Sequence, residues 1–123
     1  MESEQAREQA KSKLKSIMAL VERAHHAQTH DMDAIEEEIF NSPLSVEVSS
    51  GWTPVGEKLK PAKYNLLMTT GGPGTRIVGD LDTEGIPATV DIEYQDWNTP
   101  WTKYPLSNEE LQAILEFAQY FSY

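Results

Sequence analysis

The chain has 123 residues, no cysteine and a formal net charge of -10 at pH 7. This length favours one domain with its own core, and the lack of cysteine excludes disulfides, thiolate zinc sites and a thiol nucleophile. The acidic balance argues against direct binding to nucleic acid, because proteins that bind phosphate backbones carry basic surfaces, and no apolar run reaches the roughly 20 residues that a membrane-spanning helix needs.

Residues 1–42 are expected to form two helices. From Ala6 to about His26, apolar residues recur at helical spacing and predict an amphipathic helix with one buried stripe. A shorter helix is predicted to begin at Asp33, because Asp33 and Glu36 have the spacing of a capping box, and to end at Asn41 before a proline. The first residues are charged where a secretory signal would be apolar, so we expect a cytoplasmic protein.

Three histidines, His25, His26 and His30, lie at the junction of these helices. If the first helix continued, His26 and His30 would share a face, and Asp31 or Asp33 could complete a minimal metal site for a metal-dependent enzyme. The alternative is an exposed helix end, where the helix dipole favours histidine. Because a helix break is expected inside the segment, we favour the alternative and predict no metal or other cofactor.

Residues 43–104 are expected to form an antiparallel sheet. Apolar and polar residues alternate in four segments, which predict strands at 44–49, 64–69, 76–81 and 90–95. A long polar loop containing Lys58, Lys60 and Lys63 follows the first strand and is either mobile or functional. The glycine-rich turn at 71–74 precedes a strand and lacks the Walker A pattern, which favours a hairpin over a phosphate-binding loop.

Residues 105–123 predict a C-terminal helix with the clearest signals in the chain. Ser107 and Glu110 form a capping box, and one apolar face continues to the end of the sequence. Phe117, Tyr120 and Tyr123 flank that face, and they either widen the core contact or form a dimer contact. The whole pattern predicts a single α+β domain: a four-stranded antiparallel sheet with the N-terminal helices and the C-terminal helix packed on one face.

The outward positions of the predicted strands carry Glu47, Asp80, Asp91 and Glu93, with Arg76 as the single base among them. Such a face can imitate the phosphates of nucleic acid and occupy the basic groove of a protein that handles nucleic acid. The alternative is an ordinary solvated sheet face, which composition alone favours.

An aromatic loop lies beside these acids and contributes Tyr94, Asp96, Trp97, Trp101 and Tyr104. Aromatic side chains are frequent binding hot spots, although they can equally cap the open end of a sheet. We treat the four acids and these five residues as a candidate partner-binding surface. We expect no enzyme activity, because the sequence has no catalytic motif and exposed carboxylates in ordinary surroundings lack the shifted pKa that acid–base catalysis needs.

Three strings in the sequence resemble a group of small proteins encoded by tailed phages and prophages of Gram-negative bacteria: PLSVEVSSGW at 43–52, TGGP at 70–73 and EYQDWNTPWT at 93–102. The likeness covers roughly residues 43–104, and it implies a genomic setting and a fold but no catalytic residue. Small acidic phage proteins without cysteine or enzymatic motifs are similar to inhibitors of host defence, among which the anti-CRISPR proteins are the most varied class.

The resemblance therefore implies an inhibitor in the host cytoplasm that covers a CRISPR–Cas component through the acidic, aromatic-flanked surface. The alternative is an accessory or regulatory phage protein without inhibitory activity, which acts as a homo-oligomer through its C-terminal aromatic face. Neither interpretation predicts direct contact with nucleic acid or with a membrane.

Overall fold

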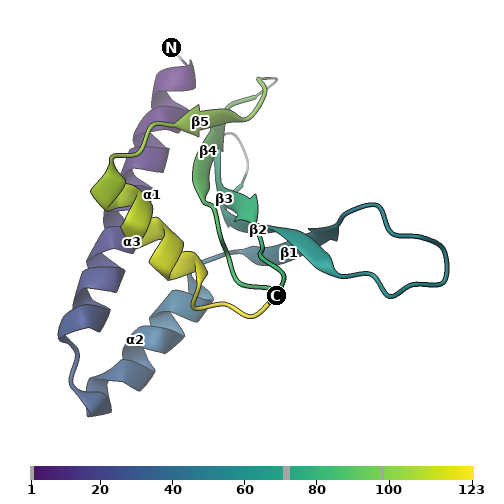
Figure 1. Ribbon diagram of the computed structural model, residues 1–123. Coiled ribbons are helices and arrows are strands. Elements are labelled where there is room, and N and C mark those ends of the chain that lie inside the picture. Colours follow the sequence, from purple (N-terminus) through teal and green to yellow (C-terminus); the bar gives the residue numbers. More distant parts are fainter. Residues whose placement is uncertain (1, 71–72, 98) are drawn as a thin grey trace.

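The computed structural model describes residues 2–70, 73–97 and 99–123 (Figure 1). Over these residues the chain forms three helices and five strands, which confirms the predicted α+β class. The elements are, in chain order, α1 (Glu2–His26), α2 (Thr29–Asn41), β1 (Ser45–Ser50), β2 (Pro61–Thr69), β3 (Gly74–Asp80), β4 (Asp91–Gln95), β5 (Thr102–Tyr104) and α3 (Asn108–Ala118).

The sheet is an antiparallel meander in which the strands lie side by side in sequence order, β1 to β5. It has five strands, so the prediction of four is wrong. The additional strand is β5, which pairs Tyr104 with Ile92 and Thr102 with Tyr94 on β4. Three residues are too few to show alternation, and Pro100 just before them indicates a loop. The sequence therefore gave no signal for this edge strand.

The two N-terminal helices begin earlier than the sequence predicts. α1 starts at Glu2, and α2 starts at Thr29 after the N-cap residue Gln28, whose side chain makes no capping hydrogen bond. The capping box predicted at Asp33 therefore lies inside the helix. Burial of Ile35 and Ile39 stabilises α2, because tertiary packing of an apolar face contributes more to a short helix than its cap does.

The core lies where the sheet and the helices meet. It includes Leu14 and Ile17 of α1, Ile77 of β3 and Ile92 of β4, all of which are buried. α1 packs against β3 and β4, while α2 and α3 each pack against α1. Figure 1 shows α2 folding back from the C-terminal end of α1. The sheet face that carries Ile77 and Ile92 is therefore the inner face, and Arg76 and Glu93 lie on the opposite, outer face.

α3 begins as predicted. The Ser107 hydroxyl accepts a hydrogen bond from the backbone N–H of Glu110 at 3.2 Å, and the Glu110 carboxylate accepts one from the backbone N–H of Ser107 at 2.8 Å. Phe117 is fully buried, and the Tyr123 ring packs on Tyr64 with 5.1 Å between ring centroids. A dimer contact through Phe117 is therefore wrong, because its ring belongs to the core of the chain itself.

Candidate binding surfaces

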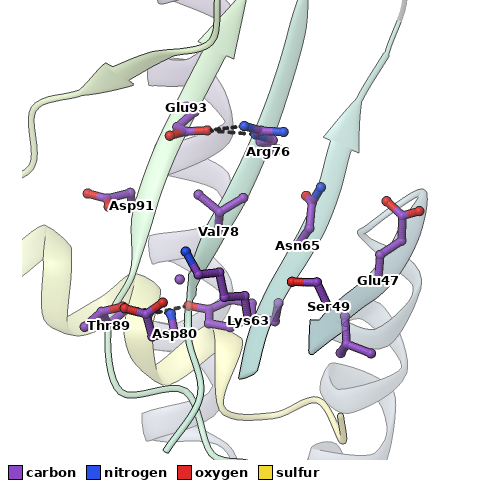
Figure 2. Close-up of a pocket in the computed structure, with 13 residues that line it drawn as sticks. Glu47, Ser49, Lys63, Asn65, Arg76, Val78, Asp80, Thr89, Asp91 and Glu93 are labelled. Carbon is purple, nitrogen blue, oxygen red and sulfur yellow. Dashed lines mark hydrogen bonds and ion pairs between the residues drawn. The ribbon is translucent and has the colours of Figure 1, made fainter. Parts of the chain in front are cut away.

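The outer face of the sheet brings together the four acids that the sequence placed on one side of the strands. Glu47, Asn65, Val78 and Asp91 are neighbours across β1 to β4, and Asp80 and Glu93 lie in the adjacent rows. These side chains line an open hollow of about 570 Å³ (Figure 2). The alternation in the sequence thus predicted this arrangement correctly.

Basic side chains on the same face nevertheless offset most of that negative charge. The Arg76 guanidinium pairs with Glu93 at 2.7 Å, and the Lys103 ammonium lies 3.5 Å from Asp91. Lys63 on β2 stands opposite Asp80 on β3. The expectation of a single base is therefore wrong: three cations face four carboxylates. Lys63 and Lys103 were missed because the sequence assigns both to loops.

Trp101 packs on the sheet. Its ring lies 4.1 Å from the guanidinium carbon of Arg76, a cation–π contact. A Cβ atom added at Gly74 would come within 3.4 Å of the same ring, so glycine allows the indole to approach the strand. These contacts favour the interpretation that Trp101 caps the sheet over the interpretation that it binds a partner.

The other members of the predicted aromatic loop differ in exposure. Asp96 is buried, and its carboxylate accepts a hydrogen bond from the backbone N–H of Trp97 at 2.8 Å, which makes it a turn-forming residue. The rings of Tyr94 and Tyr104 meet edge to face at 6.5 Å. Trp97 is 66% exposed. Of the five residues proposed from the sequence, Trp97 alone presents most of its side chain for binding.

Most of the negative charge of the chain lies on the helices. Residues 20–41 and 108–118 contain nine carboxylates and a single Lys or Arg, which is Arg23. All nine carboxylate side chains are at least partly exposed. We call this set the acidic helical surface. It consists of Glu22, Asp31, Asp33, Glu36, Glu37, Glu38, Glu109, Glu110 and Glu116.

Specific contacts connect the three helices that carry this surface. Glu116 on α3 pairs with His25 on α1 at 2.6 Å, and Glu38 on α2 pairs with Arg23 on α1 at 3.0 Å. Burial raises the pKa of the Tyr120 hydroxyl, and the nearby charges of Glu116 and Glu36 raise it further. Carboxylates from α2 and α3 therefore both raise the pKa of Tyr120, although their helices are far apart in the sequence.

A groove of about 500 Å³ lies between α1 and α3. Glu22, Glu109 and Glu116 line it together with apolar side chains that include Met18 and Leu115. This groove was not predicted from the sequence, because charged positions on amphipathic helices normally indicate a solvated face. The combination of acidic and apolar lining is suited to basic side chains with long aliphatic stems.

The three histidines that were considered as ligands of a metal site have separate partners. His26 pairs with Glu22 at 2.9 Å, and His30 lies 3.6 Å from Asp31. α1 ends at His26 and α2 begins at Thr29, so His26 and His30 do not lie on one continuous helix. In the part of the chain that the structure describes, no three His, Asp or Glu side chains form a group that could hold a metal ion.

A third surface is apolar and was not predicted. Residues 51–60, which join β1 to β2, extend away from the helices (Figure 1), and Trp52 and Val55 near the start of this segment are completely exposed. β1 adds Val46 and Val48, about half exposed. These two residues pair with Leu66 and Tyr64 on β2, so they belong to the inner face but lie beyond the cover of the helices.

Comparisons with known proteins found no matching protein-family model, no similar curated protein and no similar solved structure. Across residues 2–70, 73–97 and 99–123, no helix is both long enough and apolar enough to cross a lipid bilayer.

Proposed function

We propose that the protein is an inhibitor that acts by binding and has no catalytic activity of its own. Its target is a host defence complex, such as a CRISPR–Cas component, and it covers a basic surface on which that complex handles nucleic acid. The setting is the cytoplasm of a phage-infected bacterium. The observation that carries the proposal is the excess of nine carboxylates over one Lys or Arg on the acidic helical surface.

The physical basis is electrostatic complementarity. A surface that binds phosphates responds to negative charge whatever group supplies it, and complementary charge both accelerates association and aligns the partners. The acidic helical surface supplies that charge over three helices. The outer sheet face supplies less, because Glu93 is already paired with Arg76 and Asp91 lies beside Lys103.

The outer sheet face and Trp97 keep a secondary place in the proposal. Glu47 and Asp80 line the hollow, and Trp97 offers an exposed aromatic anchor. We assign them the edge of the contact, and we assign its centre to the groove between α1 and α3. The phage setting rests on the resemblance of residues 43–104, whereas the choice of a basic target rests on charge.

Expression of the protein in hosts that carry different CRISPR types, followed by phage plating, tests this function. We expect phage to plate more efficiently in at least one host, and we expect the tagged protein to pull down one subunit of that host's complex. Unchanged plating in every host, together with recovery of the protein alone, would contradict the proposal.

A further inference from the structure

The large apolar side chains that remain exposed are concentrated in one part of the chain. Among the described residues nine are exposed, and seven of them lie between 40 and 59. They fall into two groups. The arm, residues 51–60, carries Trp52, Val55 and Leu59, and the apolar strip consists of Phe40, Leu44, Val46 and Val48.

The strip lies at an open edge of the molecule. β1 is the first strand in the sheet order, so one of its edges has no neighbouring strand among the described residues. Phe40 at the end of α2 contacts Phe121 at 5.6 Å between ring centroids, yet it is still 47% exposed. Soluble monomers rarely leave contiguous apolar patches of this kind uncovered, and such patches usually mark a contact with another protein.

The charges around the two groups are complementary. The arm carries Lys58 and Lys60, with Lys63 just beyond it, against a single acid, Glu57. The strip is flanked on α2 by Glu36 and Glu37, which lie four and three residues before Phe40 and therefore on neighbouring positions of the same helix face. An arm rich in lysine and apolar residues thus matches an apolar strip bordered by carboxylates.

Both halves of this match occur on the same chain, but they cannot meet within one molecule when the arm points away from α2 as in Figure 1. Two copies related by a twofold axis satisfy both at once, because the arm of each copy reaches the strip of the other. We propose that the protein forms a homodimer by this exchange of arms, in which Trp52 and Val55 of one copy cover Val46 and Val48 of the second.

This inference does not rest on the proposed function. It uses Glu36 and Glu37 of the acidic helical surface but none of the carboxylates that line the groove between α1 and α3, so a dimer would still present two such grooves. It also differs from a dimer through the C-terminal aromatic face, since Phe117 is buried within its own chain.

Light scattering coupled to size exclusion tests the dimer on the full chain. We expect twice the chain mass of 13.9 kDa at micromolar concentration. The double substitution Trp52→Ser and Val55→Ser should give a folded monomer, because both side chains are exposed in the single chain and neither belongs to its core. The matched control Trp97→Ser, at another exposed tryptophan, should remain dimeric. A monomeric parent protein, or a double variant that stays dimeric, would overturn the inference.

The absence of cysteine makes disulfide trapping a clean test of the exchange. Two single variants, Val55→Cys and Val46→Cys, are mixed and oxidised with oxidised glutathione. We expect the mixed pair to cross-link at least severalfold more than either variant alone. Preferential cross-linking of Val55→Cys to itself would instead indicate contact between arms, and it would overturn the exchange.

Charge substitutions provide a third, independent test of the dimer. Lys58→Glu with Lys60→Glu should weaken the dimer roughly tenfold or more, because like charges then meet across the interface. Glu36→Lys with Glu37→Lys in the same chain should restore the affinity. A dimer that is insensitive to the first pair, or not rescued by the second, would contradict the assigned pairing of arm and strip.

Discussion

Arg76 on β3 donates hydrogen bonds from Nε and Nη2 to one carboxylate oxygen of Glu93 on β4, at 2.8 and 2.7 Å. The two residues are directly opposite in the strand register, and both side chains are largely buried, at 26% and 15% exposed. The Trp101 ring covers the guanidinium. The Glu93 carboxylate, which was a candidate binding residue in the sequence, thus links β3 to β4.

Arg76→Ala should lower the free energy of unfolding by about 2 kcal/mol, because Glu93 would remain a poorly hydrated charge without its partner. Lys103→Ala is the matched control. It removes the pair with Asp91, whose side chains are 70% and 44% exposed, and it should cost less than about 1 kcal/mol. Urea denaturation followed by circular dichroism measures both. Equal losses would show that burial does not strengthen the Arg76–Glu93 pair.

Gly79→Ala should destabilise the protein by about 2 kcal/mol or more, because a small-to-large change at a tightly packed position forces the backbone to move. A Cβ atom at this position would lie 2.1 Å from the carbonyl oxygen of Thr89 and 2.8 Å from the Tyr64 hydroxyl. Gly51→Ala, where nothing lies within 4 Å, serves as the control and should change stability by less than about 0.5 kcal/mol. Similar midpoints of urea unfolding for both variants would contradict this account of the β3 packing.

Stability should fall when the pH rises above about 10, the ordinary pKa of tyrosine. Burial raises the pKa of the Tyr64 hydroxyl, with further contributions from the charges of Tyr123 and Asp91, and burial also raises the pKa of Tyr123. The folded state therefore holds these protons more tightly than the unfolded state. The stabilisation that these two hydroxyls contribute is fully present below about pH 10 and is lost as the pH rises toward their raised pKa values.

Urea midpoints measured between pH 8 and pH 11.5 test this dependence. The double variant Tyr64→Phe and Tyr123→Phe should be less stable at pH 8, because Tyr64 donates a 2.7 Å hydrogen bond to the Thr89 carbonyl and Tyr123 one of 2.8 Å to the Ala118 carbonyl. Its midpoint should nevertheless fall less steeply with pH than that of the parent protein. Parallel curves would exclude the two tyrosines as the cause.

Ser107→Ala should lower the free energy of unfolding by about 1 kcal/mol, since the backbone N–H of Glu110 would lose its acceptor at the start of α3. Ser12→Ala provides a control on a helix surface, because its side chain is exposed and it caps no helix end. Thermal unfolding measures both variants. A larger loss for Ser12→Ala than for Ser107→Ala would contradict the importance of the capping box.

Local sequence signals predicted the parts of the fold that depend on local chemistry. Ser107 and Glu110 specify the start of α3, and the alternation around Ile77 and Ile92 identifies the inner sheet face. β5 was not predictable, because three residues depend on pairing with β4 and not on their own pattern. The start of α2 was misplaced at Asp33 for a related reason: burial of Ile35 and Ile39 outweighs a side-chain cap.

The candidate site was only partly predictable, because charge on a surface depends on which elements meet there. Alternation placed Glu47, Asp80, Asp91 and Glu93 on one face. It could not place Lys103, which reaches that face only through β5. Likewise, the proximity of Glu36 and Glu116 around Tyr120 joins helices that lie at opposite ends of the chain. Tertiary packing creates both features.

The most direct test of the central claim measures how tightly two charge-reversal variants bind the subunit recovered by pull-down. Glu22→Lys with Glu109→Lys changes the groove of the acidic helical surface, and Glu47→Lys with Asp80→Lys makes the same charge change on the outer sheet face. Affinities are measured at several salt concentrations. We predict that the helical pair weakens binding at least tenfold and flattens its salt dependence, while the sheet pair changes affinity less than threefold. Equal effects, or a larger effect of the sheet pair, would contradict the claim that the helices carry the binding charge.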